Sequence, residues 1–376
     1  MDAPGRRRCF VLVLLFTGSL LGGVASAQPK PGVVPGKDWE RIESPESVGY
    51  SSARLQALRP WVQALDTTAL MVVVGGRSLL EYGDLSHLSY LASVRKSVLA
   101  MLYGKYVEDG TIPLGRTLRE LGFTDIGGLT DRELDATLEH LVTARSGVYH
   151  PAANSGDATA SAPPRGSQPP GTYFIYNNWD FNAAGAAFEK LTGRNIYDAL
   201  ESDLARPIAM QDFVRARQTK TGDTTRSQHQ AYHMWLSTRD MARIGLLMLR
   251  DGSWAGQQVV PREWTKRIRG VFTPFHELNP PQARSLATGN RWAYGYMWWV
   301  WDAPNATGAF GGAYTGIGAG GQFITVLPQL DMVVAHKTDV DQQSRHAPRR
   351  RWVSGIEYDS ILRLLLATRC RADQCP

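Results

Sequence analysis

Residues 93–109 read SVRKSVLAMLYGKYVED, a predicted helix that opens with a serine and carries a lysine three positions later. Ser93 is placed to cap the helix, which we expect to run to Asp109 and to end at Gly110. No other serine in the sequence has a lysine at this spacing. Three residues of helix correspond to about 300° and about 4.5 Å of rise, so Ser93 and Lys96 share one face. The pair suits a nucleophile with an adjacent amine base.

A lysine that acts as a base must lose its charge. Lowering its pKa by about three units costs on the order of 4 kcal/mol, which requires burial or cationic neighbours. An isolated S-x-x-K is more often a surface helix start with a solvated lysine. Here a second motif accompanies it, Tyr176-Asn177-Asn178, which follows Pro170-Gly171-Thr172. On an extended segment Tyr176 and Asn178 point the same way, so a phenol could relay a proton while an amide orients the lysine or the substrate.

Strand patterns occur near both ends of the chain, with helical patterns between them. We therefore predict one α/β domain over residues 41–376, in which both ends build one sheet, terminal helices flank it, and residues from about 114 to 250 form an inserted helical lobe. The expected helices are 51–66, 93–109, 129–144, 180–191, 195–205, 237–250 and 352–369, and the expected strands are a hairpin over 70–82, then 294–301, 322–327 and 332–336.

The N-terminus has the pattern of a secretory signal. Three arginines (6–8) precede an apolar run, and Ala25-Ser26-Ala27 offers a cleavage site, so residues 1–27 are predicted to be removed and residues 28–40 to form a linker. The apolar run is too short to span a bilayer comfortably, so we expect a periplasmic or secreted protein without a stable membrane span. Cleavage reduces the net charge from +6 to +4.

Composition excludes several classes of function. The basic residues are scattered rather than gathered in a stripe, which argues against nucleic-acid binding. No metal-ligand spacing is present, and no cofactor or metal is expected. Cleavage would leave Cys370 and Cys375, which in an oxidising compartment could close a small loop at the C-terminal tail or remain free thiols.

The motifs together resemble the serine hydrolases of the class C β-lactamase and D-Ala-D-Ala peptidase superfamily. The resemblance rests on Ser93-Val94-Arg95-Lys96, on Ser146-Gly147-Val148-Tyr149 and on residues 170–178, and it extends from about residue 45 to 368. It implies a β-lactamase-like antiparallel sheet with an inserted all-helical lobe. It also implies acylation of Ser93, assisted by Lys96 as general base and Tyr176 as proton relay, and then hydrolysis of the acyl-enzyme.

The third motif of that superfamily is a K-T-G or H-x-G strand, and here the sequence departs from it. Lys220-Thr221-Gly222 spells the tripeptide but has no predicted strand behind it, so we interpret it as chance. Tyr314-Thr315-Gly316 has the better position and lacks a Lys or His. This resembles the branch that includes esterases and 6-aminohexanoate-oligomer hydrolases.

The same glycine-rich run contains Gly316-x-Gly318-x-x-Gly321, formally a dinucleotide fingerprint. It precedes a strand instead of opening a helix, so we discard that interpretation. We assign the oxyanion hole to the amides of Ser93 and Ala319; glycines that serve only a bulge are the alternative.

The aromatic run from Tyr294 to Trp301 is predicted as one strand, with Tyr294, Tyr296, Trp298 and Val300 on one face. That face belongs to the core or walls an apolar substrate pocket. We predict an exported serine hydrolase acting on a small ester, amide or peptide. The alternatives are a β-lactamase or D-Ala-D-Ala carboxypeptidase, and, from another class, a non-catalytic cell-wall peptide or penicillin-binding module.

Overall fold

The computed structural model describes Met1 and residues 33–154, 156, 158–279, 292–302, 304, 306–339 and 352–370. The predicted signal sequence and Cys375 lie outside the described residues. Within them, one seven-stranded sheet has the order β2-β1-β13-β12-β11-β10-β9, and every neighbouring pair is antiparallel. Its strands are β1 (Ala69–Val74), β2 (Arg77–Gly83), β9 (Trp292–Tyr294), β10 (Trp299–Trp301), β11 (Tyr314–Gly318), β12 (Gln322–Leu327) and β13 (Met332–Lys337). The predicted antiparallel sheet built from both ends is thus confirmed.

Both faces of the sheet are apolar and covered by helices. On β1, Leu70 and Val72 belong to the hydrophobic cluster formed with the terminal helices α1 (Ser52–Ala64) and α11 (Gly355–Ala367). Met71 and Val73 alternate with them and belong to the cluster on the opposite side. This two-sided burial explains why β1 and β13 have nearly continuous apolar sequences.

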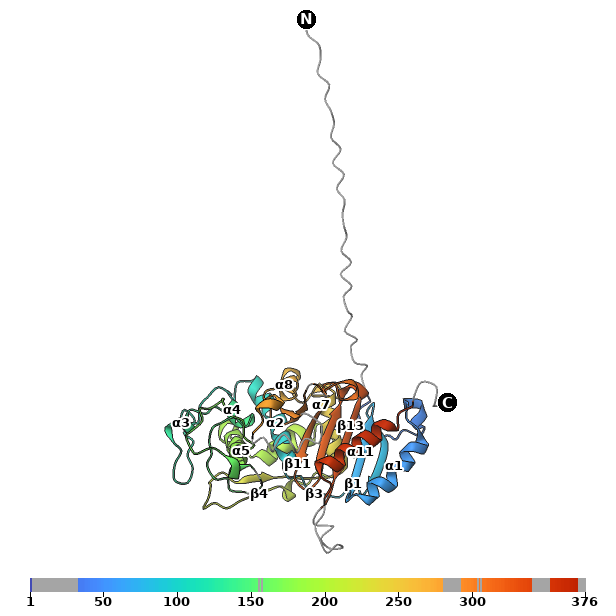
Figure 1. Cartoon of the computed structure of the whole chain (residues 1–376), viewed down its shortest axis with the longest axis horizontal. Helices are drawn as coiled ribbons and strands as arrows, with labels where there is room; N and C mark the ends of the chain where they lie inside the picture. The colour runs from blue at the N-terminus through green and yellow to red at the C-terminus, as the bar shows by residue number, and fades with distance from the viewer. Residues whose placement is uncertain are drawn as a thin grey trace. The chain divides into compact units, whose positions relative to one another are not determined.

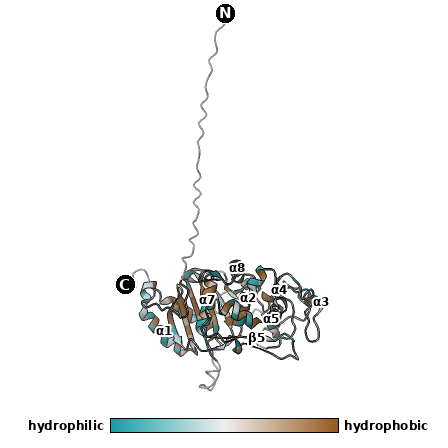
Figure 2. Ribbon diagram, turned by 180° about the vertical axis from the view of Figure 1, so that it is seen from behind, coloured by the Kyte–Doolittle hydropathy of each residue, from teal (hydrophilic) through white to brown (hydrophobic). Residues whose placement is uncertain are grey.

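Figure 1 shows α11 crossing one face of the sheet, with α1 beside it. On the other face, seen from behind in Figure 2, the helix α7 (Thr238–Leu249) packs on β1, β12 and β13. Gly245 allows this close packing, because a Cβ there would lie 2.4 Å from a methyl group of Val333. The helix α7, which was included in the predicted lobe of residues 114–250, thus packs on the sheet.

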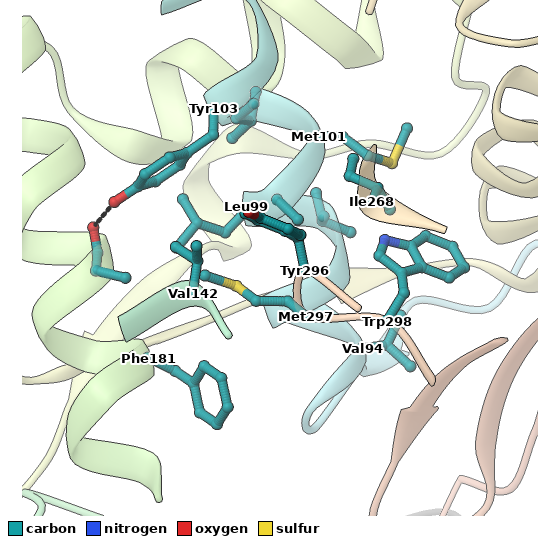
Figure 3. Close-up of a cluster of buried hydrophobic side chains, with 14 of the residues drawn as sticks. Val94, Leu99, Met101, Tyr103, Val142, Phe181, Ile268, Tyr296, Met297 and Trp298 are labelled. Atoms are coloured by element: carbon teal, nitrogen blue, oxygen red, sulfur yellow. Dashed lines mark hydrogen bonds between the residues drawn. The ribbon is translucent and has the colours of Figure 1, made fainter. Parts of the chain in front are cut away.

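The helix α2 (Val94–Glu108) lies between the sheet and the lobe, and its residues are almost all buried. Figure 3 shows the apolar side chains that surround it. The remaining elements are α3 (Asp131–Leu134), α4 (Leu138–Val142), α5 (Asn178–Thr192), α6 (Ile196–Ala199), a π-helical turn (Leu200–Ala205), α8 (Arg262–Ile268), and the short strand pairs β3 (Ser89–Tyr90) with β6 (Trp235–Leu236), β4 (Thr219–Thr221) with β5 (Ala231–His233), and β7 (Ser253–Trp254) with β8 (Gln257–Gln258).

Two predicted elements are wrong because local capping and turns interrupt them. The expected helix 129–144 is two short helices, each started by its own capping box, at Thr130 and at Thr137. The expected strand 294–301 is a hairpin, in which Trp299 pairs with Tyr294. Gly295 lies at the bend, where a Cβ would come within 2.2 Å of the Ile268 carbonyl oxygen.

Both ends of the described chain are attached to the body. Buried Arg243 donates hydrogen bonds to the carbonyl groups of Gly36 and Lys37, both at 2.9 Å, and so holds the described part of the predicted linker. Cys370 is disulfide-bonded, and its amide donates to the Gly49 carbonyl. Among the described residues, no helix is both long and apolar enough to cross a membrane.

Candidate active site

Ser93 stands at the N-terminus of α2, directly after the strand β3. The preceding residue, Ala92, has the left-handed backbone angle φ 48°, which gives the sharp turn from strand to helix. Lys337 fixes the position of the strand that leads into this turn. Its Nζ donates to the carbonyl oxygens of Ser89 on β3 and Leu236 on β6, both at 2.7 Å. The nucleophile candidate is therefore held by a short strand pair that β13 anchors.

The amino group of Lys96 joins all the predicted catalytic side chains. Its Nζ lies 3.1 Å from Ser93 Oγ, 2.7 Å from Tyr176 Oη and 2.7 Å from Asn178 Oδ1. Lys96 is only 1% exposed. The four residues that the sequence singled out are thus adjacent in the structure, although they come from two segments about eighty positions apart.

Aromatic rings enclose the Lys96 amine. Nζ lies 4.1 Å from the ring centroid of Tyr176 and 4.4 Å from that of Phe181. Trp299 stacks on Tyr176 with centroids 5.7 Å apart and an interplanar angle of 24°. The core interpretation of Tyr294, Tyr296, Trp298 and Val300 is confirmed, since all four are buried in one hydrophobic cluster. Sequence reasoning missed Phe181, and it missed Trp299, which the β9–β10 bend brings against Tyr176.

The start of α5 positions Tyr176 and Asn178. Asn177 caps this helix, since its side chain accepts from the Trp179 amide at 2.9 Å and its Nδ2 donates to the Val148 carbonyl at 2.6 Å. Ser146 donates to Asp180 Oδ1 at 2.6 Å, which ties the same two segments together a second time. The Ser146–Tyr149 motif therefore supports the helix that carries Asn178. Asp180 was not foreseen, because a buried carboxylate within a helix gives no motif.

The glycine-rich strand β11 lies against the nucleophile segment. A Cβ on Gly318 would come within 2.4 Å of the Leu91 carbonyl oxygen, and one on Gly316 would lie 3.0 Å from Ser97 Oγ. Ala319 follows Gly318 in the turn to β12, and Gln322 Nε2 holds this turn through the Gly320 carbonyl at 2.8 Å. This packing brings the Ala319 turn beside the segment that leads to Ser93.

His336 supports the same turn. Its Nδ1 lies 2.9 Å from the Gly321 carbonyl oxygen and its Nε2 lies 2.9 Å from Thr67 Oγ1. Burial lowers the pKa of His336 to about 4, so the ring is neutral at neutral pH. Its two hydrogen bonds give it a structural role.

Lys220 is not part of the site. It lies on the short strand β4, where its amine forms an ion pair with Glu189. The expectation that no strand carries Lys220-Thr221-Gly222 is wrong, although its exclusion from the site stands. Gly316 on β11, which faces Ser97, supplies no cation, so this strand offers backbone groups alone beside α2.

The geometry is that of a serine next to an amine, a phenol and an amide in a largely apolar enclosure. A neutral Lys96 could accept the Ser93 proton, and Tyr176 could pass a proton between the amine and a leaving group. Within the described residues no group of three or more His, Cys, Asp or Glu side chains could hold a metal ion.

Comparison with known proteins finds related sequences over most of the chain. A family model described as Beta-lactamase matches residues 58–353. The 6-aminohexanoate-dimer hydrolase of Paenarthrobacter ureafaciens is 24% identical over 377 residues, covering 92% of this chain and 88% of the relative.

Solved structures share the fold at low sequence identity. A candidate 6-aminohexanoate-dimer hydrolase from Bacillus anthracis superposes with a TM-score of 0.60 at 20% identity, over 88% of this chain and 86% of that one. A β-lactamase from Mycobacterium bovis superposes with a TM-score of 0.54 at 19% identity, over 82% and 97% of the two chains.

Proposed function

The chain belongs to the Beta-lactamase family and is a serine hydrolase of the β-lactamase fold, and we propose that it cleaves an ester or amide through an acyl intermediate on Ser93. One observation supports this proposal most strongly: the Lys96 amine contacts Ser93, Tyr176 and Asn178 at the same time. A protein that only binds a ligand needs no such set.

Acylation begins when neutral Lys96 takes the proton of the Ser93 hydroxyl. The Ser93 Oγ forms a bond to the substrate carbonyl carbon, and the carbonyl oxygen becomes an oxyanion that the amides of Ser93 and Ala319 stabilise. Each such donor is worth about 3–4 kcal/mol in the transition state.

The tetrahedral intermediate collapses when the bond to the leaving group breaks. The proton on Lys96 passes through the Tyr176 hydroxyl to the leaving oxygen or nitrogen, which leaves as the alcohol or amine. Water then attacks the acyl carbon and gives up a proton to the Lys96–Tyr176 pair. The bond between this carbon and Ser93 Oγ breaks, the pair returns the proton to Oγ, and the acid leaves.

Small esters and amides are the favoured substrates. Gly316 supplies no cation on β11 for a substrate carboxylate, whereas Trp299 and Tyr176 offer a flat apolar surface beside the amine. Because one relative is named a 6-aminohexanoate-dimer hydrolase, we include linear amides among the candidate substrates.

Two other functions are weighed against this one. A β-lactamase or D-Ala-D-Ala carboxypeptidase would use the same acyl-serine chemistry. The similar structure from M. bovis is described as a β-lactamase, which supports this alternative. A non-catalytic cell-wall peptide or penicillin-binding module would release at most one equivalent of product.

Labelling tests the nucleophile. We expect a fluorophosphonate to modify the wild type and not Ser93→Ala, whereas Ser167→Ala, which changes an exposed serine, is labelled normally. Labelling of Ser93→Ala equal to that of the wild type would refute the assignment.

A substrate panel tests the class. Chromogenic short-chain esters, linear amides, D-Ala-D-Ala peptides and cephalosporins are compared by kcat/KM, and we expect the esters or amides to rank first. A higher kcat/KM for cephalosporins or D-Ala peptides would favour the alternative enzyme, and a single equivalent of product from all would favour the binding module.

Export is the remaining part of the proposal. It rests on the N-terminal charge, apolar run and small-residue site, which predict cleavage after Ala27 and release into the periplasm or medium. N-terminal sequencing of the mature protein should begin at Gln28, and retention of Met1 would contradict cleavage.

A further inference from the structure

Arg95, between Ser93 and Lys96 on α2, is a buried cation that has no acidic partner among the described residues. It is 2% exposed. Its Nη2 donates to Asn182 Oδ1 at 3.2 Å, and its Nη1 has no hydrogen-bond partner. No ion pair in the described part of the chain includes Arg95. A buried charge is costly unless it is paired, so this guanidinium requires an explanation.

Two buried tyrosines near Arg95 also have hydroxyl groups without a partner. The guanidinium carbon of Arg95 lies 4.5 Å from the ring centroid of Tyr232, which is 1% exposed. Tyr197 is 3% exposed, and neither its hydroxyl nor that of Tyr232 forms a hydrogen bond. Burial raises the pKa of both phenols well above the usual value, and the charge of Arg95 offsets part of this rise in both. At Tyr232 the approach of the Arg95 guanidinium to the hydroxyl oxygen adds to this offset, so the Tyr232 O–H itself stays available to donate. Both phenols therefore keep their protons and can donate.

Among the described residues, the groups around Arg95 supply no unpaired negative charge. The Tyr90 hydroxyl lies 2.8 Å from His233 Nδ1, and burial, followed by the charge of Arg95, lowers the pKa of His233 to about 4. This histidine is therefore neutral at neutral pH. The carboxylate that acts on Tyr197, Glu189, is ion-paired with Lys220.

We propose that Arg95, Tyr232 and Tyr197 bind a small monovalent anion, either a halide or a short carboxylate such as formate. A buried cation beside two phenol donors matches the charge and hydrogen-bonding needs of such an ion, whereas a water molecule would leave the guanidinium charge uncompensated.

The location links the ion to the catalytic elements. Arg95 lies on α2 beside Lys96, and its partner Asn182 lies on α5 one turn beyond Asn178. Tyr232 belongs to β5 and Tyr197 to α6. An ion at this place would connect four elements, including both helices that carry the Lys96–Asn178 contact. The site is separate from the proposed hydrolysis and does not depend on it.

Thermal unfolding of Tyr232→Phe tests the site. At constant ionic strength, sodium gluconate is replaced by sodium bromide or sodium formate, because gluconate is too large for a buried site. The wild-type Tm should rise by about 2–4 °C and then saturate, since a ligand of the folded state stabilises it. Tyr232→Phe should fold, because its hydroxyl has no partner to lose, and its Tm should not respond.

Tyr103→Phe is the matched control. Tyr103 is a buried tyrosine of α2 whose hydroxyl donates to the Ala184 carbonyl at 2.7 Å (Figure 3). This variant should have a lower Tm in every salt and keep the full anion response. The proposal would be overturned if bromide or formate raised the Tm of Tyr232→Phe as much as that of the wild type. It would also be overturned if neither salt raised the Tm of the wild type. A response to formate alone would identify the short carboxylate, and a response to bromide the halide.

Anomalous scattering from crystals soaked in bromide gives a direct readout if the ion is a halide. We expect a peak within hydrogen-bond distance of Arg95 Nη1 in the wild type and none in Arg95→Met. For formate the same position should show planar density. Surface peaks only, or a single water at Nη1 in both salts, would refute the anion site.

Discussion

The Lys96 amine lies 2.7 Å from the Tyr176 hydroxyl, although the two residues are eighty positions apart in the chain. Lys96 comes from α2, and Tyr176 comes from the segment just before α5. These helices pack against each other, so the contact exists only when both elements are in place.

Tyr176→Phe should remove the proton relay and keep the aromatic enclosure. The ring can still stack on Trp299, but no hydroxyl remains beside Lys96. We expect kcat/KM for a chromogenic ester to fall by about 10²–10⁴-fold, the usual contribution of a positioned acid or base. The control is Tyr173→Phe, a part-exposed tyrosine three residues earlier, which should retain wild-type kinetics. Equal losses in both variants would assign the effect to packing.

Lys96→Ala should abolish acylation. Without the amine no group takes the Ser93 proton, so burst kinetics with a chromogenic ester should show no acyl-enzyme formation. Lys105→Ala removes an exposed lysine from the last turn of the same helix and should change neither kinetics nor stability appreciably. Near-normal turnover by Lys96→Ala would eliminate it as the base.

Adjacent asparagines should have separable roles. Asn177→Ala should lower the free energy of unfolding by about 0.5–2 kcal/mol, because it removes the cap of α5. Asn178→Ala removes a hydrogen bond to the Lys96 amine, and such bonds are worth about 1.5–3 kcal/mol, so kcat/KM should fall about 10- to 100-fold. Urea unfolding and ester kinetics on both variants check this. A loss of kcat/KM in Asn177→Ala together with unchanged kcat/KM in Asn178→Ala would contradict the assignment of Asn177 as the cap and Asn178 as the partner of Lys96.

Gly318→Ala should damage the proposed oxyanion turn. The added Cβ would lie 2.4 Å from the Leu91 carbonyl oxygen, a backbone atom that cannot rotate away. We expect activity to drop at least tenfold and Tm to fall. Gly115→Ala is the control, because a Cβ at Gly115 meets nothing within 4 Å. Wild-type activity in Gly318→Ala would show that β11 does not approach the nucleophile so closely.

Lys337 should make stability depend on pH in the alkaline range. Burial lowers its pKa from 10.5 to about 7. Between these values the unfolded chain binds the proton that the folded protein lacks, so the free energy of unfolding rises with pH by up to about 1.4 kcal/mol per unit. Below about pH 7 both states are protonated and this contribution is constant.

Urea unfolding from pH 6.5 to 9.5 measures this contribution against Lys337→Met. The difference in stability between wild type and variant should shift in favour of the wild type as pH rises. Parallel profiles for the two proteins would show that Lys337 does not titrate in this range.

Local signals predicted many elements well. The predicted strand 322–327 is β12, and the predicted hairpin over 70–82 is β1 and β2, since alternation and turn residues act over a few positions. The expected helix 129–144 failed because a second local capping box, at Thr137, starts a new helix, whereas the expected strand 294–301 failed because a neighbouring segment intervenes. Gly295 bends away because the Ile268 backbone lies against it, and a sequence pattern carries no information about that contact.

The sequence by itself determined the chemistry of the candidate site. The spacing of Ser93 and Lys96 follows from helix periodicity, and Tyr176 and Asn178 are two residues apart at the start of α5, so both spacings are properties of the local chain. The tertiary structure alone decided which aromatic ring encloses Lys96, how closely Gly318 approaches Leu91, and that Arg95 is buried with no counter-ion among the described residues. Each of these depends on segments distant in the chain, whose approach is set by the packing of α2 between the sheet and α5.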